Sequence, residues 1–111
     1  MTGITTHLLD IGTGRPLAGV QVELYDVATD PPTLLNKTAT NADGRTNAPM
    51  LPAASARMGQ FELRFHVGEY FKSAEALSDV VPVRFAVFDA AQHYHVPMLC
   101  APWFFSTYRG S

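Results

Sequence analysis

The sequence lacks the features that mark several large classes of protein. It has 111 residues, one cysteine (Cys100), a formal net charge of −2 and no cluster of lysine and arginine. A single cysteine cannot form an internal disulfide, which argues against a secreted, cross-linked scaffold. The absence of a basic cluster argues against binding to nucleic acid. No apolar run approaches the roughly 20 residues of a membrane-spanning helix, so we expect no membrane partner.

The composition indicates one globular domain. Of the residues, 47% are hydrophobic and 16% are charged. A chain of this length buries roughly two-thirds of its unfolded surface, which is enough for a core of its own. We therefore expect a single domain over residues 1–111. The chain starts without a signal-peptide pattern, which predicts a soluble, cytoplasmic protein unless a signal has already been removed.

Hydrophobic residues alternate with polar ones along much of the chain. The alternation is unbroken over residues 61–67 and 20–24, and it is looser over 81–87. A period of two is typical of strands with one buried face. Weaker strand candidates lie at residues 4–9, 33–40, 93–100 and 103–109. About seven or eight short strands separated by turn signals predict an antiparallel β-sandwich, with Cys100 buried on its core face.

One segment departs from the period of two. Residues 70–77 are rich in helix formers, and their apolar members are spaced to share one face of a helix: Tyr70, Phe71, Ala74 and Leu77. The sequence therefore predicts a helix of two turns over residues 70–77, between two strands.

Three histidines are candidate functional residues. In a strand over residues 93–100, His93 and His95 share the face opposite the apolar residues, so we expect both imidazoles to point away from the core. His7 lies on the first predicted strand and, taken alone, is more simply interpreted as a half-exposed strand histidine. The three histidines could instead form a metal site. We favour this alternative less, because no carboxylate in the 93–97 segment could orient an imidazole.

Arg45 directly follows a tight turn, Asn41-Ala42-Asp43-Gly44, in which glycine supplies a positive φ. Such a turn fixes where the guanidinium emerges. A fixed guanidinium suits a planar anion or a developing oxyanion. Without further context, an arginine on a solvent-exposed hairpin is the simpler interpretation.

The end of the chain combines aromatic and polar groups. Trp103, Phe104 and Phe105 are consecutive, so in a strand at least one ring projects from the core. Exposed aromatic residues of this kind often mark an interface, which predicts a homo-oligomer. Residues 108–111, Tyr-Arg-Gly-Ser, bring a phenol, a guanidinium and a terminal carboxylate together. We expect a functional tail rather than a loose end.

Four segments occur in a set order and spacing. They are Thr5-Thr6-His7-Leu8-Leu9-Asp10, Thr40-Asn41-Ala42-Asp43-Gly44-Arg45, His93-Tyr94-His95-Val96-Pro97 and Ser106-Thr107-Tyr108-Arg109-Gly110-Ser111. Together they closely resemble the 5-hydroxyisourate hydrolases, the transthyretin-related enzymes of purine breakdown. The resemblance covers residues 4–111. It implies an all-β, transthyretin-like fold, an antiparallel β-sandwich of two four-stranded sheets with one short helix.

The resemblance also implies an activity. Enzymes of this family open the ring of 5-hydroxyisourate, the product of urate oxidation, by hydrolysing a ring amide without a cofactor. Their two catalytic histidines and their arginine correspond to His7, His95 and Arg45, and the tail residues Tyr108 and Ser111 help to form the substrate site. One histidine is expected to be the base and the other its partner or the acid. The family implies a homotetramer, a dimer of dimers, with active sites in the channel between the dimers.

Two considerations bear on this interpretation. The family commonly has glycine where this chain has Phe104, which adds bulk near the expected surface between dimers. A ligand carrier of the transthyretin type or a structural sandwich would share the fold, but transthyretin lacks the Tyr-Arg-Gly-Ser ending. His7, His95 and the tail come from distant segments. They can meet only if their strands are neighbours or if a second subunit completes the site.

Overall fold

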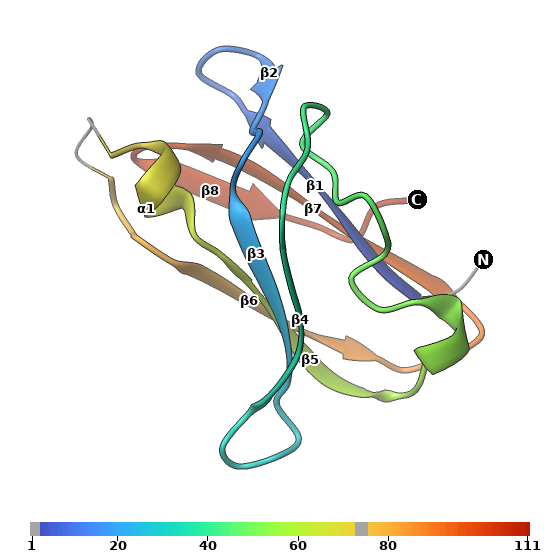
Figure 1. Ribbon diagram of the computed structural model, residues 1–111. Helices are drawn as coiled ribbons and strands as arrows, with labels where there is room; N and C mark the ends of the chain where they lie inside the picture. The colour runs from blue at the N-terminus through green and yellow to red at the C-terminus, as the bar shows by residue number, and fades with distance from the viewer. Residues whose placement is uncertain (1–2, 73–75) are drawn as a thin grey trace.

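The computed structural model describes residues 3–72 and 76–111, which form a sandwich of two four-stranded sheets (Figure 1). The first sheet has the order β2-β1-β7-β8 and consists of β1 (Gly3–Asp10), β2 (Arg15–Pro16), β7 (His93–Ala101) and β8 (Phe104–Thr107). The second has the order β4-β3-β5-β6 and consists of β3 (Gln21–Asp26), β4 (Thr33–Ala39), β5 (Gly59–Phe65) and β6 (Val81–Val87). The predicted two-sheet architecture is confirmed.

The core lies between the sheets and is built by the alternation seen in the sequence. Its largest fully buried side chains come from both sheets and include Leu8, Leu24, Phe61, Leu63 and Met98. Cys100 is buried among them as predicted. Burial raises the pKa of its thiol to about 11, so this cysteine is a packing residue and not a nucleophile.

One pairing departs from the antiparallel arrangement. Strands β1 and β7 run parallel, with Thr5 opposite His95 and His7 opposite Pro97. The segments between them build the whole second sheet and then return, so β7 enters beside β1 in the same direction. The first and the next-to-last long strands are therefore immediate neighbours.

The helix predicted over residues 70–77 is shifted. Helix α1 spans Val67–Tyr70, Ala76 and Leu77 are not helical, and residues 73–75 lie outside the described part. The residues that anchor this turn to the core are Val67 and Phe71, while Tyr70 is exposed. The prediction was wrong because the apolar residues that face the core include Val67, whereas Tyr70 and Leu77 are exposed.

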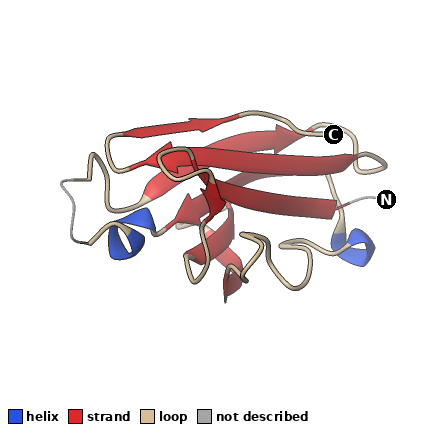
Figure 2. Cartoon of the chain, turned by 90° about the horizontal axis from the view of Figure 1, so that it is seen from above, coloured by secondary structure: helices blue, strands red, loops and turns tan. Residues whose placement is uncertain are grey.

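A second helical segment, the 3-10 turn Ala53–Ser55, lies at the opposite end of the sandwich from α1 (Figure 2). Across residues 3–72 and 76–111, no helix is long and apolar enough to cross a membrane.

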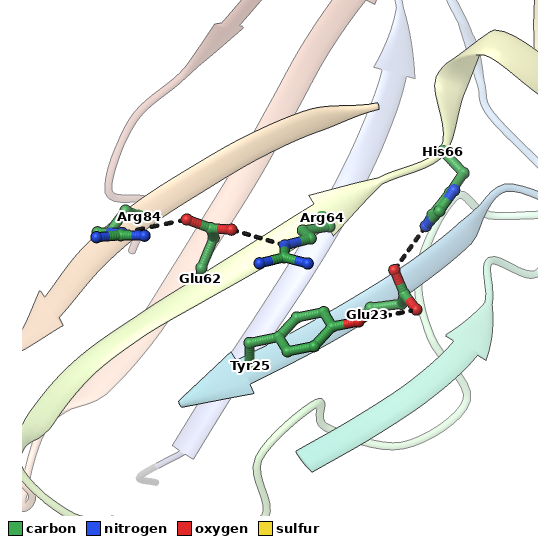
Figure 3. A network of polar contacts seen from close by, with 6 residues as sticks. All are labelled: Glu23, Tyr25, Glu62, Arg64, His66 and Arg84. Carbon is green, nitrogen blue, oxygen red and sulfur yellow. Dashed lines mark hydrogen bonds and ion pairs between the residues drawn. The ribbon is translucent and has the colours of Figure 1, made fainter. Parts of the chain in front are cut away.

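The outward face of the second sheet carries an ion-pair network (Figure 3). The carboxylate of Glu62, only 6% exposed, accepts hydrogen bonds from Nε of Arg64 at 2.7 Å and from Nε of Arg84 at 3.1 Å. The Arg64 guanidinium also lies over the ring of Tyr25, 3.9 Å from its centroid. The two long arginine side chains cover the carboxylate, so this face is held together by charge as well as by backbone pairing.

Replacing Glu62 by glutamine is expected to remove the part of the pH-dependent stability that this carboxylate contributes. Burial opposes ionisation of this carboxyl, but the hydrogen bonds from Arg64 and Arg84 outweigh it and lower its pKa. A lowered folded-state pKa stabilises the protein above the ordinary glutamate value of about 4.3, and this stabilisation is lost as the pH falls through the folded-state value. In urea titrations, the variant should be roughly 1–2 kcal/mol less stable at pH 7 and closer to wild type at pH 3.

The same loss at both pH values would show that the glutamine only disturbs packing. The pKa values of Glu23 and Asp26 are also lowered, through hydrogen bonds from His66 and Arg57 respectively. Some acid sensitivity should therefore remain in the variant, and the comparison with wild type is made at each pH.

Candidate active site

Side chains from β1 and β7 meet on the outward face of the first sheet. The parallel register sets Thr5 beside His95 and Gly3 beside His93, so both histidines lie on the same face as Thr5 and His7. Tyr94, on the opposite face, is buried. The prediction that the imidazoles point away from the core is confirmed.

The turn before Arg45 is rigid and lies against β1. The Asn41 side-chain oxygen accepts hydrogen bonds from the backbone N–H groups of Asp43 at 2.9 Å and Arg45 at 3.2 Å. The carbonyl of Gly44 accepts from the Leu8 backbone N–H at 2.9 Å, and a backbone bridge pairs His7 with Arg45. The turn thereby delivers the guanidinium to the strand that carries His7.

The tail follows β7 instead of leaving the domain. The Gly110 N–H donates to the His95 carbonyl at 2.7 Å, and the Thr107 hydroxyl donates to the Pro97 carbonyl at 2.7 Å. A Cβ atom at Gly110 would lie 2.7 Å from Cδ2 of His95, so the approach of the tail to this imidazole requires glycine. Ser111 is thus brought to the histidine face.

Arg109 has a bracing function that the sequence did not reveal. Its guanidinium donates to Oε1 of Gln92 at 2.8 Å and to the His93 carbonyl at 3.1 Å, and it lies 4.2 Å from the centroid of the Tyr94 ring. These contacts hold the tail to the beginning of β7. The arginine of the Tyr-Arg-Gly-Ser ending therefore anchors the tail within its own chain.

These elements surround a hollow of about 390 Å³. Among the residues that line it are Thr5, Arg45, Asn47, His93, His95 and Ser111. The structure thus brings three of the predicted site residues, Arg45, His95 and Ser111, to one cavity.

The other two predicted residues lie elsewhere. His7 stands beside the hollow, bridged to Arg45 and paired with Pro97, without lining it. Tyr108 is 57% exposed and lines a separate, largely apolar hollow of about 260 Å³ with Val83 and Phe85 of β6. Within one chain, Tyr108 therefore does not reach the histidine site.

The environment of His95 favours a neutral imidazole. Burial lowers its pKa, and the positive charge of Arg45 and the neighbouring His93 and His7 lower it further. The Thr5 hydroxyl lies 2.8 Å from Nδ1 of His95 and 2.8 Å from Nε2 of His93. Thr5 was not singled out from the sequence, because its link to His95 depends on strand pairing across 90 residues.

The imidazole and guanidinium groups at the hollow have the chemical properties that hydrolysis requires. A neutral imidazole can take a proton from water near neutral pH, and a fixed guanidinium can stabilise the oxyanion that forms at an attacked carbonyl. No group of three histidine, cysteine or acidic side chains among residues 3–72 and 76–111 is placed to hold a metal ion.

The fold defines the general class of the protein. A crystal structure of transthyretin from Sparus aurata superposes on this chain with a TM-score of 0.89, covering 99% of this chain and 97% of that one at 18% identity. Likeness at this identity concerns the fold alone. The chain has the transthyretin fold.

Sequence comparison narrows the class further. The HIUase/Transthyretin family matches residues 4–110. A 5-hydroxyisourate hydrolase from Deinococcus radiodurans is 48% identical over 114 residues, covering 98% of this chain and 96% of that protein. The structure of Klebsiella pneumoniae 5-hydroxyisourate hydrolase superposes with a TM-score of 0.85 at 34% identity, covering 100% of both chains. The chain belongs to the HIUase/transthyretin family.

Titration of His95 tests the electrostatics of the hollow. In proton NMR, the pKa of His95 should lie below the ordinary histidine value of 6.5, because of burial and the charge of Arg45. The variant Arg45→Met should raise this pKa by removing the charge. A His95 pKa that does not move in Arg45→Met would contradict the proximity of the two groups.

A pair of glycine variants tests the docking of the Arg45 turn. Gly44 and Gly14 have φ values of 74° and 75°, so alanine at either position meets the left-handed strain of roughly 1–2 kcal/mol. A Cβ at Gly44 would also overlap the Leu8 carbonyl oxygen, whereas nothing lies within 4 Å at Gly14. Denaturant unfolding should show Gly44→Ala to be about 1–3 kcal/mol less stable than Gly14→Ala. Equal losses would mean that the turn does not pack against β1.

Proposed function

We propose that this protein is a single-domain enzyme that hydrolyses 5-hydroxyisourate to 2-oxo-4-hydroxy-4-carboxy-5-ureidoimidazoline in urate breakdown. The observation that carries the proposal is the convergence of Arg45, His95 and Ser111 on one hollow, drawn from a turn, a strand and the tail. The names of the Deinococcus and Klebsiella relatives support the substrate. A hollow of about 390 Å³ is within the range of small-molecule sites, roughly 300–1,000 Å³, and suits a purine-sized ring system.

The proposed reaction begins with a water molecule in the hollow. Nε2 of His95 takes a proton from this water, and the resulting hydroxide attacks the carbonyl carbon of the ring amide. Arg45 stabilises the oxyanion on the tetrahedral carbon. The ring C–N bond then breaks, and the proton returns to the leaving nitrogen from His95 or from His7 as its partner. Ser111 binds a ring edge of the substrate.

The pKa of His95 supports its assignment as the base. A base must be unprotonated at the working pH, and burial together with Arg45 shifts His95 towards the neutral form. His7 stands next to Arg45 through a backbone bridge but outside the cavity lining, which suits a partner better than a first proton acceptor. No cofactor is assigned in this scheme.

We further propose a homotetramer, a dimer of dimers. Strands β6 and β8 are edge strands of their sheets, and edge strands offer unpaired backbone groups to another chain. Trp103, Phe104 and Phe105 around β8 are all exposed, as predicted for at least one of them. Tyr108 directly follows β8 and would contribute to substrate binding across a subunit boundary.

We propose the cytoplasm as the compartment. The support is indirect: Cys100 is free and buried, so the described core uses no disulfide and needs no oxidising environment.

Catalysis is tested with freshly generated 5-hydroxyisourate, made from urate by urate oxidase and followed by ultraviolet absorbance. The protein should accelerate its decay, His95→Asn should lower the rate by about 10²–10⁴-fold, and Arg45→Glu should lower it comparably. The control His66→Asn removes the histidine that directly follows β5 and bonds Glu23, and it should keep the rate. Decay no faster than without protein would refute the activity and leave a carrier or a structural protein.

Assembly is tested by sedimentation equilibrium. Wild type should have four times the mass of the chain, and Phe104→Glu should lower this mass by placing a charge on the aromatic surface next to β8. Leu34→Glu is the matched control. Leu34 is also exposed, but it lies on β4, the edge strand of the second sheet that is farthest from β6. A monomeric wild type, or equal effects of the two variants, would contradict the proposed interface.

A further inference from the structure

Two imidazoles on the histidine face share one hydroxyl group. Thr5 lies on β1 directly opposite His95 of β7, and its Oγ1 is 2.8 Å from Nδ1 of His95 and 2.8 Å from Nε2 of His93. These are the hydrogen-bonding contacts of Oγ1 within the part of the chain that is described. Nδ1 of His93 is buried there without a partner. The shared contact leaves Nε2 of His95 as the ring nitrogen available to the hollow.

The proton count of this cluster couples the two rings. A threonine hydroxyl has one proton, so it can donate to only one imidazole and must accept an N–H from the other. If both rings donated, the threonine proton would have no acceptor among the described protein groups and would have to be given to solvent in the hollow. Two arrangements remain, and they assign opposite tautomers to His95.

In one arrangement His95 donates its Nδ1–H to Thr5, and Thr5 donates to Nε2 of His93. His93 then carries its own proton on Nδ1, which has no acceptor among the described residues, an unsatisfied group of the kind found at functional sites. Nε2 of His95 then faces the hollow with a free lone pair. In the other, His93 donates to Thr5, Thr5 donates to Nδ1 of His95, and Nε2 of His95 carries the proton. Only the first arrangement leaves His95 able to accept a proton from water.

We propose that Thr5 is a positioning residue that, together with His93, holds His95 in the tautomer with an unprotonated Nε2. Thr5 acts through the imidazole and not on the substrate. The choice of this arrangement over the other rests on the proposed hydrolytic function, which requires an unprotonated Nε2, whereas the tautomer is measured in the resting protein without substrate. The proposal also explains why a histidine that is not the base lines the same hollow.

The geometry makes Thr5 suited to this task. The strand register fixes both ends of the contact, because Thr5 and His95 are a backbone-paired couple and His93 is two residues away on the same face. Other charged or titratable groups around His95 are His7 from β1 and Arg45 from the turn. Neither is hydrogen-bonded to its ring, so they shift its charge but do not select its tautomer.

The test compares Thr5→Val, which keeps the shape but removes the hydroxyl, with Thr5→Ser, which keeps the hydroxyl. Long-range ¹H–¹⁵N NMR should show an unprotonated Nε2 of His95 in wild type and in Thr5→Ser, and a shift towards protonated Nε2 in Thr5→Val. With 5-hydroxyisourate, Thr5→Val should lose about tenfold or more in kcat with little change in KM. Thr5→Ser should keep most of the rate, and the acid limb of its pH profile should stay in place.

Thr38→Val is the matched control, because Thr38 is a half-buried strand threonine on the other sheet. It should leave both readouts unchanged. His93→Phe provides a second route if Thr5→Val fails to fold: it frees the threonine proton to donate to Nδ1 of His95, so Nε2 should become protonated and kcat should fall.

The proposal is overturned if Thr5→Val, or His93→Phe in its place, leaves the His95 tautomer and kcat unchanged. It is also overturned if Thr5→Ser loses as much as Thr5→Val. A wild-type protein that does not accelerate hydrolysis would refute the proposed function separately, since the NMR comparison still decides whether Thr5 sets the tautomer.

Discussion

The parallel pairing of β1 with β7 is the constraint on which the rest of the site depends. It sets Thr5 against His95 and places His93 two residues away on the same outward face. Every other component is attached to this pair by backbone hydrogen bonds: the Arg45 turn through Leu8 of β1, and the tail through His95 of β7. The positions of the candidate site residues are therefore set by main-chain pairing of the elements that carry them.

The residues that stabilise the fold and the residues of the candidate site lie on different faces of the sheets. The inward faces of the sheets are apolar, and the outward face of the second sheet is covered by the ion pairs of Glu62 with Arg64 and Arg84. The histidine face of the first sheet keeps a hollow lined by polar groups. The approach of Gly110 to the His95 ring shows how closely the tail is fitted to this face, since a methyl group there would meet the imidazole.

The sequence predicted the parts of the fold that depend on local pattern, and it missed those that depend on distant pairing. Alternation identified the strands, and the Asn-x-Asp-Gly turn identified a fixed Arg45. The helix was misplaced because burial of Val67 and Phe71 decides where that turn lies, and period alone does not show it. Thr5 went unnoticed because its partners are 88 and 90 residues away. The catalytic and binding roles of His7, Arg45, His95, Tyr108 and Ser111 all remain predictions. His7 and Tyr108 differ from the other three in not lining the hollow.

The central claim is that neutral His95, held on the β1–β7 pair beside Arg45, is the base of a hydrolytic site. The most direct measurement is the pH dependence of kcat/KM for 5-hydroxyisourate, set beside the NMR titration of His95 in the same protein. The account predicts that the acid limb of the rate profile has the pKa of His95, and that both move together when Arg45 loses its charge in Arg45→Met. A limb that stays in place while the His95 titration shifts would show that another group is the base.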